Sequence, residues 1–202
     1  MQIKKRNIFT FNRFFGILYV MKKIGFYLLF FFISSTVLPK DNVRIGAYAG
    51  YFSSRDNTIQ EIYTRGDITY GVKIGVRIWK GFSIWLSGTQ FRKVSETSLL
   101  GDITTLTLNP LFLSLRYTIP LGSVNPYLGG GYAYIYYKEK SDIGNVSGEG
   151  KGYCLDAGVE IKLSRRFHLD IGASYSDVKV RPTGFDIQLG GLQAGISFLV
   201  IF

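Results

Sequence analysis

The feature that most constrains the fold of this chain is an alternation of apolar and polar residues with a period of two, which recurs from Val43 to Phe202. Successive side chains of a β-strand point to opposite faces, so each alternating segment predicts a strand with one apolar face. No long amphipathic helical pattern interrupts the series, which indicates an all-β domain. The clearest segments are Val43–Phe52, Ile68–Trp79, Phe82–Phe91, Leu111–Ile119, Tyr153–Leu163 and Phe167–Tyr175.

Two further segments bring the expected number of strands to about eight. Residues Tyr127–Tyr137 are strand-like, although the glycines Gly129, Gly130 and Gly131 leave the direction of their faces open. In the last segment, apolar and aromatic residues alternate with small polar ones up to the terminal Phe202. A soluble domain rarely ends on an exposed aromatic strand, whereas a strand that closes a membrane barrel turns its apolar face to lipid.

The connections between these segments alternate in length. The long, polar links are Ser53–Asp67, Val94–Asp102, Glu139–Gly152 and Asp177–Gly184. The short links are Lys80-Gly81, Leu121–Asn125 and Ser164–Arg166. Outer-membrane barrels have short periplasmic turns and longer outward loops, and an even strand number places both ends on the periplasmic side. The alternation therefore favours a transmembrane barrel.

Aromatic residues gather near both ends of the expected strands, as they do at two membrane interfaces. Those on the short-turn side are Trp79, Phe82, Tyr117, Tyr127, Phe167 and Phe202. Those on the long-loop side are Tyr51, Tyr70, Phe91, Tyr137, Tyr153 and Tyr175. A soluble lipocalin-like barrel is the rival fold, because it shares the strand pattern with the apolar residues turned inside. The two aromatic bands, the loop asymmetry and the terminal strand favour the membrane.

The N-terminal residues 1–40 have the pattern of a secretory signal peptide. They are basic at first and then apolar from Ile24 to Val37, a run of roughly 14 residues that is shorter than the ~20 a spanning helix needs. An uncleaved anchor is the alternative. Met21-Lys22-Lys23 opens a compact signal by itself, so Met21 is a possible true start. Residues 41–202 then form the single barrel domain.

The formal charge of +10 does not indicate a nucleic-acid partner. Seven of the 24 Lys and Arg residues precede Asp41, where there is no acidic residue, and the remaining chain carries only about three excess positive charges. Cys154 is the single cysteine, so an intrachain disulfide is excluded.

Three stretches of this sequence resemble the small outer-membrane β-barrel proteins of diderm bacteria, of the OmpA/OmpX type: Asn109–Tyr117, Pro126–Tyr132 and the C-terminal segment. The resemblance covers roughly residues 42–202. It implies a closed antiparallel transmembrane barrel of about eight strands, located in the outer membrane. It also implies three partners: outer-membrane lipid, periplasmic chaperones and the barrel assembly machinery. The assembly signal of the final strand would consist of Gln193, Gly195, Phe198 and Val200, with Phe202 following.

Strand parity assigns a set of charged residues to the barrel interior. They are Lys73, Arg77, Arg116, Asp156, Glu160, Lys162 and Asp170. An eight-stranded barrel is just wide enough for its own side chains, and buried charges are costly unless they are paired. The sequence therefore predicts a salt-bridge network across the interior, between basic residues of the second and fourth strands and acidic residues mainly of the sixth and seventh. A gated ion path is the functional alternative, which Arg77→Ala would test in planar bilayers.

A catalytic role requires a nucleophile, a base and an orienting group within hydrogen-bond reach. His168 is the only histidine, and Ser83 or Ser164 with Asp170 could complete a triad. We expect instead that His168 is a structural member of the interior network, and that the protein is not an enzyme. One histidine and one cysteine cannot assemble a usual zinc site, so we expect no metal or other cofactor.

The expected function is a non-catalytic one at the cell surface: membrane integrity, adhesion or binding of an unknown ligand through outward loops. Ser53–Gly66 and Glu139–Gly152 are the candidate binding loops. The first alternative is a porin-like, narrow channel for small apolar solutes, with an opening lined by Phe112, Tyr132 and Tyr134. The second alternative is a lipid-modifying outer-membrane enzyme.

Overall fold

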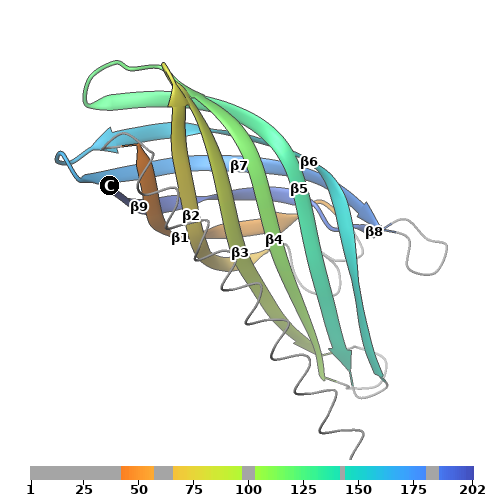
Figure 1. Cartoon of the computed structure of the whole chain (residues 1–202). Helices are drawn as coiled ribbons and strands as arrows, with labels where there is room; N and C mark the ends of the chain where they lie inside the picture. The colour runs from red at the N-terminus through yellow and green to blue at the C-terminus, as the bar shows by residue number, and fades with distance from the viewer. Residues whose placement is uncertain (1–41, 57–65, 97–102, 142–143, 181–186) are drawn as a thin grey trace, which may run out of the picture. The chain divides into compact units, whose positions relative to one another are not determined.

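The structure, a computed structural model, describes residues 42–56, 66–96, 103–141, 144–180 and 187–202, which lie within one compact unit, Asp41–Phe202 (Figure 1). Its strands are β1 (Val43–Ser54), β2 (Asp67–Trp79), β3 (Phe82–Glu96), β4 (Ile103–Thr118), β5 (Val124–Ser141), β6 (Gly144–Lys162), β7 (Phe167–Val180), β8 (Ile187–Gln188) and β9 (Gly191–Ile201). Within these ranges, no helix has the length and hydropathy needed to cross a bilayer.

Eight of these strands form a closed antiparallel barrel. Each strand from β1 to β7 pairs with the next one along the chain, and β9 closes the wall by pairing with both β7 and β1. The two-residue strand β8 adds to the end of β7 (Figure 1). The predicted all-β, eight-stranded closed barrel is therefore confirmed.

The register of the pairings fixes the tilt of the strands. A path across paired residues that starts at Arg44 returns to β1 ten positions later, at Ser54. The path runs through Gly75, Trp85, Ser114, Gly131, Cys154, Ser176 and Gly191. A stagger of this size in eight strands corresponds to a tilt of about 40° and leaves an interior that side chains can fill.

The short links lie together at one end, which we call the turn end. Lys80-Gly81 joins β2 to β3 with a positive φ of 83° at Gly81, a conformation that favours glycine. The amide of Val43 donates to the carbonyl of Phe202, so both ends of the barrel chain lie there too. This arrangement agrees with short periplasmic turns and places the turn end on the periplasmic side.

The prediction of a loop over Glu139–Gly152 is wrong. β5 continues to Ser141 and β6 begins at Gly144, and their backbones pair along the whole length, from Val124 with Ile161 to Ser141 with Gly144. Polar residues occupy both faces of this hairpin, so it shows no alternation in the sequence. Backbone hydrogen bonds form it without help from an apolar stripe.

A row of paired glycines on neighbouring strands accommodates Tyr127 and shows which face of β5 points inward. Gly158, Gly172, Gly195 and Gly50 lie side by side on β6, β7, β9 and β1, all on the inner face. The ring of Tyr127 points inward and its hydroxyl lies over Gly158, only 2.6 Å from where a Cβ would stand. The glycines thus leave room on the inner wall for tyrosine rings to lie flat against it.

The outer face of the barrel is apolar around its middle. Its exposed residues include Leu128, at 67% exposure, and Leu155, at 55%. From Tyr153 on β6 to Leu163, the residue after that strand, the outer face is apolar. This segment rises about 25 Å at a tilt of about 40°, which matches the apolar band of outer-membrane barrels. Within this band the charged residues lie inside, opposite to the arrangement in a lipocalin-like barrel.

Candidate functional site: the barrel interior

The interior of the barrel has two halves of different chemistry. The half near the turn end is lined by buried charged groups, and the half near the long loops is filled by apolar side chains. Each half is built by the inward residues of the same strands at different heights.

Arg116 on β4 is the centre of the ionic half. Its Nε donates to Asp156 Oδ2 at 2.6 Å, and its Nη1 lies 3.8 Å from Asp170 Oδ2. The guanidinium carbon lies 4.5 Å from the ring centroid of Trp85 and 4.0 Å from that of Tyr127. Two aromatic faces and two carboxylates therefore replace part of the water that the cation would otherwise need, and Nη1 is left without a hydrogen-bond partner.

Asp170 on β7 joins this cluster to β2 and β5. Lys73 Nζ donates to Asp170 Oδ2 at 3.0 Å, and the Tyr127 hydroxyl donates to Oδ1 at 2.6 Å. Asp170 is 1% exposed, so these contacts, together with Arg116, are its substitute for solvent.

A second ionic cluster lies closer to the turn end. Glu160 on β6 accepts from Arg44 Nη1 at 2.8 Å, and its other oxygen lies 2.6 Å from His168 Nδ1. Arg44 was not among the predicted interior residues, although its parity on β1 is that of Tyr48, which also points inward. Because Arg44 and Tyr48 lie on the same face of β1, the alternation along β1 could have predicted that Arg44 points inward.

The structure therefore brings five of the seven predicted charged residues into ion pairs: Lys73, Arg116, Asp156, Glu160 and Asp170. Arg77 and Lys162 lie at the turn-end mouth and are exposed, and the described part of the chain gives neither an ion-pair partner. Parity predicts the face of a residue but not its height along the barrel.

The residues considered for catalysis do not form a triad. His168 is engaged by Glu160, whereas Ser83 accepts a hydrogen bond from Trp85 Nε1 at 2.9 Å. Ser164 Oγ accepts from the backbone amides of the turn in which it lies. Among the residues that the structure describes, no three His, Cys, Asp or Glu side chains converge as metal ligands would.

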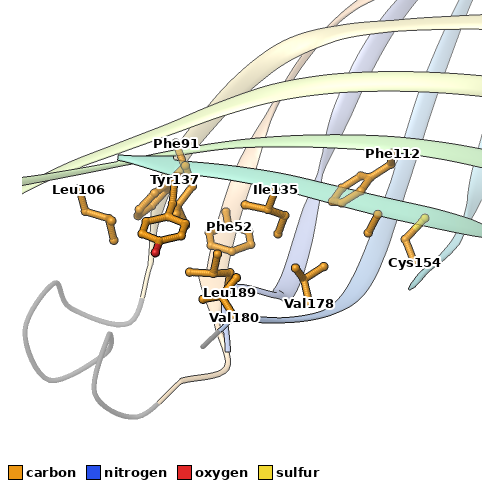
Figure 2. Packing of buried hydrophobic residues seen from close by; sticks show 12 residues of the cluster. Phe52, Phe91, Leu106, Phe112, Ile135, Tyr137, Cys154, Val178, Val180 and Leu189 are labelled. Carbon is orange, nitrogen blue, oxygen red and sulfur yellow. The ribbon is translucent and has the colours of Figure 1, made fainter. Parts of the chain in front are cut away.

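The sequence pattern did not predict the apolar half of the interior. Figure 2 shows how its buried side chains pack against one another. The rings of Phe52 and Phe91 meet edge to face, with their centroids 5.3 Å apart. The buried cluster consists of Phe52, Phe91, Leu106, Leu108, Phe112, Ala133, Ile135, Tyr137, Cys154, Val178, Val180 and Leu189, and Ile187 packs against it. We call this set the apolar plug.

The apolar plug arises because the apolar residues change from the outer face to the inner face partway along several strands. On β4 the apolar residues Leu111, Leu113 and Leu115 point outward, but Leu106 and Leu108 point inward, with threonines on the outer face between them. The same change occurs on β7, where Val178 and Val180 point inward. Where the wall leaves the membrane its outer face meets water, so apolar side chains gain by moving inside.

Hydrogen bonds at this boundary join tyrosines to polar residues of the outer face. The hydroxyl of Tyr70 donates to Gln90, that of Tyr134 to Glu149 and that of Tyr153 to Asp177. Such amphipathic rings suit a membrane interface. Asp177 also accepts a hydrogen bond from the side-chain amide of Gln188.

Little space separates the two halves of the interior. A cavity of about 30 Å³ lies there, with Phe112 on one side and Arg116 on the other, room for a water molecule or two. The predicted opening lined by Phe112, Tyr132 and Tyr134 is not formed: Phe112 points inward, whereas the pairing register puts the two tyrosines on the outer face.

The residues of the predicted assembly signal occupy both faces of β9. Gln193 is buried in the interior, and Gly195 belongs to the glycine row. Phe198 points outward and stacks on Phe167 of β7 with ring centroids 5.5 Å apart. Val200 shares its outward parity, and Phe202 is 60% exposed at the turn end.

Comparison with known proteins gives a consistent result for the fold. A family model described as the outer membrane protein beta-barrel domain matches residues 26–198. The solved structure of the outer membrane protein OprG from Pseudomonas aeruginosa has a TM-score of 0.62 and 15% sequence identity, covering 81% of this chain and 97% of that chain.

Two further solved structures have the same fold. Neisserial surface protein A has a TM-score of 0.58 and 15% identity, with 82% of this chain and 100% of that chain covered. The Yersinia pestis attachment invasion locus protein Ail, in complex with the heparin analogue sucrose octasulfate, has a TM-score of 0.52 and 15% identity, with 81% and 97% covered. A search of curated protein sequences found no significant match.

Proposed function

Since this chain belongs to the outer membrane protein beta-barrel family, we propose that it is a non-catalytic binding protein of the bacterial outer membrane, which presents its ligand site on the strand ends and loops that project outward. Its mature form would be residues 41–202, after removal of the signal peptide 1–40. The strand β9 would be the segment recognised by the assembly machinery.

The observation that supports this proposal most is that, beyond the apolar band, the apolar residues lie on the inner face of the wall and the polar residues on the outer face. The projecting strand ends have their own buried core, the apolar plug, and an outer face of polar residues. Such a construction is a water-exposed scaffold that can hold binding loops in place. A barrel that only anchored itself in lipid would have no use for the extra strand length.

The projecting β5–β6 hairpin offers the most charged part of this surface. Its outward side chains include Lys138, Lys140, Glu149 and Lys151, and Lys179 of β7 pairs directly with Lys151. Two lysines opposite each other repel. Glu149 Oε1, 3.6 Å from Lys151 Nζ, offsets part of this repulsion, and a bound anion would offset more of it. This pairing favours an anionic ligand such as a sulfated or phosphorylated glycan.

Removing the lysine pair tests the proposal. Lys151 and Lys179 lie opposite each other, and both side chains are exposed, so Lys151→Gln/Lys179→Gln removes the two cations without changing the strand register. With heparin as the probe and the protein in nanodiscs, we expect this double variant to bind at least ten-fold more weakly. A second variant with Ser53–Gly66 shortened would show whether that loop shares the site.

His168→Ala is the control, because His168 lies at the opposite end of the barrel. Unchanged heparin binding together with an absence of lipid hydrolysis by the unaltered protein would support a binding role. Heparin binding that is insensitive both to loss of the lysine pair and to shortening of Ser53–Gly66 would contradict the proposed site. Lipid hydrolysis that disappears in His168→Ala would favour the enzyme alternative.

The apolar plug favours a second candidate, a narrow path for small apolar solutes. Its side chains could line such a path, although the small cavity between Phe112 and Arg116 gives it little room. Uptake of a small apolar dye by proteoliposomes is the test. A channel would admit the dye faster than empty vesicles do, and faster still after Phe112→Ala.

A further inference from the structure

The turn end of the barrel contains a cavity of about 480 Å³ that the proposed surface role does not use. We call it the vestibule. Its lining includes four cations and a single carboxylate: Arg44, Arg77, Lys80 and Lys162 against Glu160. The remaining lining residues are neutral: Gly81, Ser83, Tyr117, Thr118, Pro120 and Asn125.

The one carboxylate of the vestibule is already engaged. Glu160 is 3% exposed, and its two oxygens are occupied by Arg44 and His168. In the ranges that the structure describes, no acidic group lies within ion-pair distance of Arg77, Lys80 or Lys162. Three exposed cations therefore converge on the cavity without a counter-charge from the protein.

Arg44 adds a donor at the base of the vestibule. The side chain is only 3% exposed, and although Nη1 binds Glu160, its Nε–H has no hydrogen-bond partner. A buried donor without a partner costs free energy, which a ligand or bound water in the cavity would recover. Glu160 thus holds the Arg44 side chain in place through Nη1, while Nε–H remains available to a hydrogen-bond acceptor in the cavity.

The surrounding turns reinforce the positive potential. Lys80-Gly81, residues 119–123 and residues 163–166 contain no acidic residue, and the last of these turns adds Arg165 and Arg166 at the same end. Charges of one sign around a recess raise the local concentration of oppositely charged solutes. This effect would act on solutes of the periplasm.

We propose that the vestibule binds a phosphate monoester or diester, which Arg77, Lys80 and Lys162 contact by charge and Arg44 contacts through Nε. A terminal phosphate carries about −1.5 to −2 charges and three acceptor oxygens, which matches several converging donors. Guanidinium groups bind phosphate oxygens with a fitting fork geometry. A volume of about 480 Å³ admits the phosphate together with a small organic group such as glycerol.

Two sources of this chemistry can reach the vestibule. Tyr117 lines it and also belongs to the outer aromatic band, where its ring lies 4.9 Å from that of Phe82, and Phe82 stacks on Trp79. The cavity therefore borders both the periplasm and the headgroup level of the inner leaflet. A soluble phosphate ester and an anionic phospholipid headgroup share the recognised group.

The experiment compares two double variants with the same loss of charge. R77Q/K80Q removes two free cations of the vestibule, whereas R92Q/K93Q removes two cations near the opposite end of β3, outside the β5–β6 hairpin. Each full-length protein is reconstituted in phosphatidylcholine nanodiscs and titrated with glycerol 3-phosphate by calorimetry. In a second arm, retention of phosphatidylglycerol from mixed nanodiscs is measured by mass spectrometry after extraction in mild detergent.

We expect the vestibule variant to weaken binding at least ten-fold in one of the two arms, and the control variant to change it less than two-fold. The arm that responds identifies the source of the phosphate. Failure of the unaltered protein to bind either probe would overturn the proposal, as would equal losses in both variants. If the vestibule variant does not fold, Lys80→Gln alone must lower the affinity of the responding probe, because Lys80 is a turn residue whose side chain is exposed.

Discussion

At the scale of the residue, the ionic half of the interior depends on Arg116. Burial of a charge is costly, and removing one partner of a buried pair is costlier still because the other charge remains without compensation. Asp156 has Arg116 as its ion-pair partner, whereas Asp170 is also held by Lys73 and Tyr127. The two aspartates should therefore respond differently to loss of the arginine.

Arg116→Met should destabilise the barrel by about 3–5 kcal/mol, since it leaves Asp156 buried and uncompensated. Adding Asp156→Asn should restore part of that loss, because an amide needs no counter-charge. Urea unfolding from lipid vesicles, in a double-mutant cycle, measures both effects. Strictly additive losses would show that the two residues do not depend on each other.

The sequence predicted the faces of the charged residues but not their partners. The alternation assigned Asp156 and Asp170 to the inner face, where the structure places them, because alternation is a property of each strand by itself. It could not tell that Arg77 and Lys162 lie at the mouth, since height depends on how far each strand extends. Likewise, the pairing of His168 with Glu160 depends on the register between β6 and β7.

At the scale of the element, the glycine row on β6, β7, β9 and β1 makes room for the ring that Tyr127 of β5 lays against the inner wall. The hydroxyl of Tyr127 lies over Gly172 and reaches Asp170 from there. A methyl group at residue 172 would occupy the place of that hydroxyl. The row is visible in the sequence only as scattered glycines, because the register that aligns them is a tertiary property.

Gly172→Ala should therefore displace the Tyr127 ring and weaken its hydrogen bond to Asp170, at a cost of about 1–3 kcal/mol. Gly88→Ala is the matched control, because its added methyl group would meet only Leu111 at an ordinary 3.6 Å. Folding yield and urea midpoints in vesicles compare the two variants. Equal midpoints for both would contradict the role of the glycine row.

The long strand ends show where sequence patterns mislead. Beyond the apolar band the outer face meets water, so the alternation inverts on β4 and disappears on the β5–β6 hairpin. The sequence predicts links such as Glu139–Gly152 there because these segments are long and polar. The inward Leu106 and Leu108 were the available signal that the wall continues as a water-exposed barrel.

At the scale of the whole molecule, the interior is closed from both ends by different means. Ion pairs fill the half near the turn end, and the apolar plug fills the other half. The fold class and outer-membrane location could be predicted from the sequence, because they follow from the period-two pattern and the asymmetry of the links. The division of the interior could not, since it arises only when all strand registers are combined.

The closed interior predicts no large steady conductance for the unaltered protein in planar bilayers. Phe112 and Arg116 line the small cavity between the two halves, so truncating both to alanine should produce conductance events that the unaltered protein lacks. Steady conductance in the unaltered protein would show an open path along the barrel.

The central claim is that apolar side chains face lipid and the interior holds the charges, and the two tryptophans report on it separately. Trp79 is 67% exposed on the outer face, and Trp85 is 1% exposed inside, six residues further along the chain. The direct measurement is quenching of tryptophan fluorescence by brominated phospholipids in reconstituted vesicles, with Trp79→Phe and Trp85→Phe isolating each signal. Strong quenching of Trp79 and weak quenching of Trp85 is the predicted result, whereas stronger quenching of Trp85 than of Trp79 would contradict it.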